Sequence, residues 1–162
     1  EEMRHLSFQG PVKVGDFDLP WAEARRLLAE PTGPTGKTNA DVLRDWWSAM
    51  PNMSPGKIDV DLREGGRYRL EMIADDGAVH TAVGEYREIR RPERVVYTWS
   101  WEGNDDAMSG SADTLVEVEF AADGAGTVVT LTHSGFGSDE IAGMHQQGWA
   151  GTLEQLALHL GG

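Results

Sequence analysis

The 162-residue chain contains no cysteine. Disulfide bonds, thiolate metal ligands and cysteine nucleophiles are therefore excluded. The chain has 14 Lys and Arg residues against 27 Asp and Glu residues, and its formal net charge of −13 makes nucleic acids and anionic membranes poor partners. No apolar run approaches the roughly 20 residues that span a bilayer, and no apolar segment follows the polar start as it would in a signal peptide. These absences favour a cytoplasmic protein that binds neither nucleic acid nor membrane.

Sequence motifs of catalysis are also missing. No serine lies in a G-x-S-x-G turn. Gly36-Lys37-Thr38 lacks the glycine five residues earlier that a phosphate-binding loop requires. A zinc site would need a third ligand such as His80 beside His133 and His145, and no short ligand spacing supports one. We therefore expect no metal and no cofactor, and the residues identify no reaction.

Alternating apolar residues predict a series of antiparallel strands. The strongest pattern covers residues 95–101, where Tyr97, Trp99 and Trp101 alternate and so share one face of a strand. Asp75-Asp76-Gly77 predicts a hairpin turn, and Gly84 within a strand predicts a bulge or a close approach of backbones. The other predicted strands cover residues 12–19, 58–62, 67–72, 79–89, 114–120 and 127–134.

Helical spacing predicts two short helices over residues 21–29 and 39–50. A long amphipathic helix is predicted from the N-cap Ser138 to about Leu160. The fold class is therefore α+β: one domain over residues 1–162, in which a curved antiparallel sheet of about seven strands wraps around the C-terminal helix. Residues 1–10 are expected to lie outside the ordered part.

Five stretches of the sequence resemble one known family. In this order they are similar to the activator-of-Hsp90-ATPase-like branch of the START-like superfamily, also described as polyketide cyclase-like or Bet v 1-like. The stretches are Asp61–Tyr68 (DLREGGRY), Gly84–Ile89 (GEYREI), Pro92–Trp99 (PERVVYTW), Leu131–Phe136 (LTHSGF) and His145–Trp149 (HQQGW).

The resemblance implies a helix-grip fold with a cavity between the sheet and the long helix. Across that superfamily the cavity holds lipids, sterols, polyketides or other hydrophobic molecules. Some members are enzymes, some are carriers, and the namesake is a co-chaperone, so the fold alone does not determine the function. Residues 30–37 lengthen the passage between the two short helices relative to the family pattern.

We expect a ligand site between the long helix and the sheet. His133 and His145 are the expected polar anchors, since a pocket needs a few polar groups among many apolar ones. They are also weak catalytic candidates, together with Glu102, and residues 102–113 are expected to form a lid. The expected apolar wall consists of Trp46, Tyr68, Met72, Tyr97, Trp99, Met144 and Trp149.

The sequence is compatible with three functions. The first is binding of a hydrophobic small molecule such as a lipid, a polyketide or an aromatic metabolite. The second is an enzyme on the same pocket, a cyclase, dehydratase or hydrolase, or a natural-product self-resistance protein. The third is a co-chaperone-like module with a closed core, in which His133 and the aromatic residues are ordinary core residues. The protein is expected to be a monomer or a homodimer.

Overall fold

The computed structural model describes residues 4–7, 12–13, 47, 52–90, 93–103, 113–123 and 126–159. The predicted helices over residues 21–29 and 39–50 lie outside these residues except for Trp47, as does most of the predicted strand 12–19. The described elements are β1 (Arg4–Ser7), β2 (Val12–Lys13), β3 (Met53–Val60), β4 (Arg67–Ala74), β5 (Val79–Arg90), β6 (Arg94–Trp101), β7 (Thr114–Asp123), β8 (Gly126–Phe136) and α3 (Asp139–His159).

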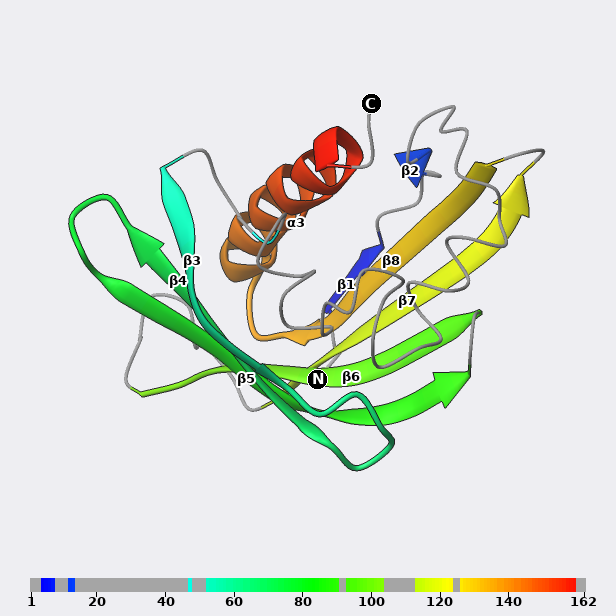
Figure 1. The fold of residues 1–162 in the computed structure, drawn as a ribbon, viewed down its shortest axis with the longest axis horizontal. Helices are drawn as coiled ribbons and strands as arrows, with labels where there is room; N and C mark the ends of the chain where they lie inside the picture. Colours follow the sequence, from blue (N-terminus) through cyan, green and yellow to red (C-terminus); the bar gives the residue numbers. More distant parts are fainter. Residues whose placement is uncertain are drawn as a thin grey trace.

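The strands form one eight-stranded sheet in the order β1-β8-β7-β6-β5-β4-β3, and β2 also pairs with β8. Every pairing is antiparallel. The sheet bends so that β3, β4 and β5 form one arm and β7 and β8 the other, with α3 between them (Figure 1). The predicted α+β helix-grip class is confirmed, with one strand more than the seven expected.

The strand that the sequence did not predict lies within residues 1–10. Arg4–Ser7 form β1 and pair with β8, with Leu6 opposite His133. A four-residue strand held by backbone hydrogen bonds is too short to show an alternating pattern, so the sequence carried no signal for it.

α3 begins where the sequence predicts. The Ile141 backbone N–H donates to the Ser138 side-chain oxygen at 3.2 Å, so Ser138 is the N-cap. Asp139 and Glu140 occupy the first turn, where the helix dipole favours negative charge. Among the described residues, no helix has both the length and the apolar character to cross a membrane.

Side chains alternate between the two faces of the sheet. On β4, Tyr68, Leu70 and Met72 are buried toward α3, whereas Arg67 and Arg69 point to the opposite, outer face. The hydrophobic core lies on the inner face and joins strands β3 to β8 to α3. Its buried members are Trp47, Ile58, Tyr68, Leu70, Met72, Ala82, Tyr86, Trp99, Val116, Leu131 and Trp149.

Gly84 on β5 is a point of close approach, as the sequence predicts. The Tyr68 hydroxyl passes Gly84 and donates to the Thr98 carbonyl of β6 at 2.5 Å. A Cβ at position 84 would lie 2.6 Å from that hydroxyl and closer still to the Thr98 carbonyl oxygen. The absence of a side chain at Gly84 therefore lets a buried tyrosine on one strand bond to a strand two positions away.

We predict that Gly84→Ala destabilises the protein by about 2–3 kcal/mol, because the new methyl group overlaps the backbone of β6. The free energy of unfolding is measured by urea denaturation. Gly143→Ala is the matched control, because a Cβ there meets no described atom within 4 Å. It should stabilise the protein by up to about 1 kcal/mol, since alanine is the better helix former. A Gly84→Ala protein as stable as the wild type would contradict this packing.

Candidate functional site: the aromatic and histidine cluster under α3

Aromatic rings from the sheet, from α3 and from Trp47 meet on the inner face. Trp99 lies at the centre, with its ring centroid 5.1 Å from Trp149 and 6.1 Å from Trp47. We call these rings the inner cluster. Its members are Trp47, Tyr68, Tyr86, Tyr97, Trp99, Trp101, His133, Phe136, His145 and Trp149.

His133 on β8 is completely buried in the cluster. Its Nδ1 accepts a hydrogen bond of 2.9 Å from Trp149 Nε1–H, and an indole nitrogen can only donate. We therefore assign the proton of the neutral imidazole to Nε2, which donates to Thr114 Oγ1 at 2.6 Å. The Thr114 hydroxyl in turn donates a hydrogen bond to the Trp99 carbonyl oxygen at 2.8 Å. The result is a fully paired chain from α3 through β8 and β7 to β6.

His145 on α3 has the opposite tautomer. Its Nε2 accepts from Trp101 Nε1–H at 2.9 Å, so its proton lies on Nδ1. Nδ1 donates to the Ile141 carbonyl one turn earlier in the helix, at 2.8 Å. Both nitrogens of both imidazoles are therefore engaged within the protein.

Burial keeps both imidazoles neutral. It is the main cause that lowers the pKa of His133 from 6.5 to about 3, and neighbouring His145 contributes in the same direction. Burial also lowers the pKa of His145. Among the described residues, no Asp, Glu, Lys or Arg is buried. The part of the interior that these residues form is thus aromatic, hydrogen-bonded and uncharged.

A bulge brings one more ring into the cluster. Gly135 has a φ of 96°, and the pairing between β1 and β8 shifts register next to it. Regular alternation would point residues 133 and 136 to opposite faces. Because of the bulge, the Phe136 ring instead lies 4.3 Å from His133 and 4.8 Å from His145.

The structure brings together most of the residues that the sequence singled out. Tyr68, Met72, Trp99, Trp149, His133 and His145 are buried on the inner face, and half-buried Tyr97 contacts Tyr68 there. Met144 is half-buried on the flank of α3 and is not part of the core cluster. Trp46 and residues 104–112 of the expected lid lie outside the described residues.

Five contributors to the site are absent from the sequence prediction: Trp47, Tyr86, Trp101, Thr114 and Phe136. The sequence pattern could have indicated Trp101 and Thr114 as inward-facing residues, because Trp101 alternates with Trp99, and Thr114 alternates with Val116 and Val118. Phe136 had none, because only the bulge at Gly135 places it beside His133.

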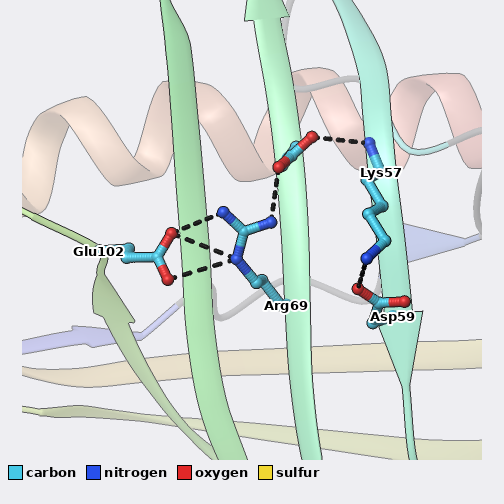
Figure 2. A network of polar contacts seen from close by, with 5 residues as sticks. Lys57, Asp59, Arg69 and Glu102 are labelled. Atoms are coloured by element: carbon cyan, nitrogen blue, oxygen red, sulfur yellow. Dashed lines mark hydrogen bonds and ion pairs between the residues drawn. The ribbon is translucent and has the colours of Figure 1, made fainter.

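Glu102, the third catalytic candidate, lies away from the inner cluster. Its carboxylate accepts from Arg69 at 2.7 Å in a network with Lys57 and Asp59 on the outer face, and α3 lies behind the strands in Figure 2. The hydrogen bond from Arg69 holds the pKa of Glu102 below its usual range, whereas a general acid needs a raised pKa. Glu102 therefore stays ionised and links β4 to the end of β6.

The outer face of the described strands also carries a groove of about 620 Å³. Charged side chains of both signs border it, including Arg67, Arg87 and Glu85. Within the described residues, no three His, Asp or Glu side chains converge as a metal ion would require.

An antiparallel sheet curved around a long C-terminal helix, with a ring-lined interface between them, defines a START-like helix-grip protein. Residues 37–161 match the model of the activator of Hsp90 ATPase homolog 1-like family, and the chain belongs to that family. No curated protein sequence matches the chain.

Solved structures agree on the fold. Protein CV1439 from Chromobacterium violaceum has a TM-score of 0.68 and 22% identity, with 97% of this chain and 94% of that chain covered. The AHSA1 protein from Silicibacter pomeroyi has a TM-score of 0.66 and 22% identity, over 98% and 97% of the two chains. CalU16 from Micromonospora echinospora has a TM-score of 0.59 and 19% identity, over 99% and 87%. At these identities the likeness shows the fold alone.

We predict an acid-sensitive stability that depends on His133. Between pH 6.5 and about 3 the unfolded chain binds a proton at this histidine that the folded chain does not bind. The free energy of unfolding should therefore fall with falling pH by up to about 1.4 kcal/mol per pH unit from this residue. His133→Asn, which offers Trp149 an oxygen acceptor in place of Nδ1, should lose this contribution.

The free energy of unfolding of the wild type and of His133→Asn is measured by urea denaturation at steps from pH 7.5 to pH 4.5. Carboxylates and His145 contribute equally to the two curves, so the difference in slope reports His133. Parallel curves would contradict a neutral, buried His133.

Proposed function

We propose that the protein binds an uncharged hydrophobic small molecule between α3 and the inner face of the sheet. The observation that carries this proposal is the character of the inner cluster: ten rings, neutral histidines and no buried formal charge among the described residues. Binding sites for small molecules are mostly aromatic and apolar, with a few placed polar groups. Membership in the family supports the same function at a coarser level.

The neutral interior favours an uncharged ligand. An ionised group moved into it would lose its hydration without gaining a counter-charge, at a cost of several kcal/mol. His133 offers no compensation, because its pKa of about 3 keeps it neutral at physiological pH. The polyketides and aromatic metabolites of the proposed class fit better than a fatty acid bound as its carboxylate.

The hydrogen bonding favours binding over catalysis. A general base needs an available lone pair within reach of a substrate proton. In His133 and His145 both lone pairs accept from tryptophans, and both N–H groups donate to protein oxygens. The two histidines thus serve to hold the walls of the proposed site.

The two walls of the proposed site are α3 and the inner face of the sheet. A ligand can enter only if these two walls separate. Trp149 of α3 contacts Trp99 of β6 directly, with centroids 5.1 Å apart. The Trp149–His133 and Trp101–His145 hydrogen bonds join α3 to the sheet at the same place. A ligand that enters between the walls displaces these ring contacts, so tryptophan fluorescence reports its binding.

We predict saturable binding of 2-acetylnaphthalene or progesterone, seen as a change in tryptophan fluorescence and as a one-to-one complex in native mass spectrometry. Oleate should bind more weakly as pH rises above the pKa of its carboxyl group.

Absence of binding by every compound in this set, with no spectral change, would overturn the proposed function. The inner cluster would then be an ordinary core.

A further inference from the structure

Polar side-chain atoms around the two histidines of the inner cluster are paired. The indole N–H groups of Trp101 and Trp149 donate to histidines, and the Tyr68 hydroxyl donates to a backbone carbonyl. Thr114 both accepts and donates. Buried polar atoms in proteins are as a rule hydrogen-bonded, so one without a partner calls for an explanation.

Trp99, at the centre of the cluster, is an exception. The residue is only 4% exposed, and its Nε1–H has no hydrogen-bond acceptor among the described residues. A buried donor without an acceptor costs about 1–3 kcal/mol. The neighbouring Trp101 of the same strand, by contrast, has its acceptor in His145. Two tryptophans on the same face of one strand thus differ: the indole N–H of Trp101 is hydrogen-bonded and that of Trp99 is not.

We infer that Trp99 Nε1–H is the donor that recognises the ligand, and that the ligand carries a neutral oxygen acceptor such as a ketone, ester or ether. This inference rests on the proposed function. An indole N–H can only donate, so its partner must be an acceptor. A carboxylate would gain one hydrogen bond there but no counter-charge, because no charged residue among those described is buried.

The position of Trp99 makes it a suitable anchor. Its ring contacts Trp149 of α3, Trp47 and His133, so it faces both walls of the proposed site. A ligand that separates the walls reaches Nε1 in the same movement. The hydrogen bond that the free protein lacks is then formed only in the complex, which gives the site discrimination between a molecule with the oxygen and one without it.

The first test removes the N–H while keeping the ring shape. Trp99 is replaced by 3-benzothienylalanine, in which sulfur takes the place of the indole N–H. Because the lost donor is unpaired, the free protein should become more stable, with Tm raised by about 2 °C or more. The same replacement at Trp101 removes a paired donor and should lower Tm by a similar amount. A fall in Tm at both positions would overturn the inference.

The second test uses two ligands of equal shape. 2-Acetylnaphthalene and 2-isopropenylnaphthalene differ only in a carbonyl oxygen against a methylene group. The wild type should bind the ketone about tenfold more tightly. This preference should disappear in the Trp99 analogue and persist in the Trp101 analogue.

The outcomes separate the two proposals. Equal affinity of the wild type for both naphthalenes overturns the role of Trp99 and leaves the proposed function standing. Persistence of the ketone preference in the Trp99 analogue overturns it as well. Failure of both naphthalenes, of progesterone and of oleate to bind overturns the proposed function.

Discussion

Two hydrogen bonds between indole and imidazole rings join the helix to the sheet, and they run in opposite directions. Trp149 of α3 donates to His133 of β8, and Trp101 of β6 donates to His145 of α3. Each bond needs a lone pair on an imidazole nitrogen, and protonation would remove it. The packing of α3 on the sheet therefore depends on two histidines that stay neutral, and burial is what keeps them so.

The rest of the charge distribution follows from this constraint. A neutral imidazole pair cannot balance a buried charge, so the described charged side chains lie on the outer face and at the edges. There they pair across strands: Arg69 reaches Glu102 from β4, and Arg94 on β6 bonds to both Glu117 and Glu119 on β7. Exposed pairs of this kind contribute little stability one by one. They do allow a chain of net charge −13 to keep charged side chains out of the interior that the described residues form.

Membership in the activator of Hsp90 ATPase homolog 1-like family accounts for the architecture and leaves the chemistry to particular residues. The inner cluster combines two opposite tendencies. Its histidines and two of its tryptophans are paired with one another, with Thr114 and with backbone carbonyls, as in a core optimised for stability. Trp99 at its centre keeps a donor that stability alone would not favour. Such a local departure from full pairing is typical of a site that receives something else.

The fold class and most strand positions could be predicted from the sequence, because period-2 alternation and the N-cap at Ser138 are local signals. The same alternation correctly placed Tyr97, Trp99 and Trp101 on one face. β1 could not be predicted, since its backbone pairing with β8 leaves no side-chain pattern. Glu102 lay next to the aromatic strand in the sequence, yet Arg69 on another strand holds it on the outer face.

The sequence by itself determined which side chains share a face, that the interior would be aromatic, and that His133 and His145 would be near it. Only the tertiary structure decided which nitrogen of each imidazole carries the proton, that Phe136 joins them through the bulge at Gly135, and that the Trp99 donor stays unpaired. These properties depend on contacts between residues far apart in the sequence, as in the Trp101–His145 bond, whose partners are 44 positions apart. A hydrogen bond needs its two atoms within about 3 Å, and local periodicity cannot specify that distance across strands and a helix.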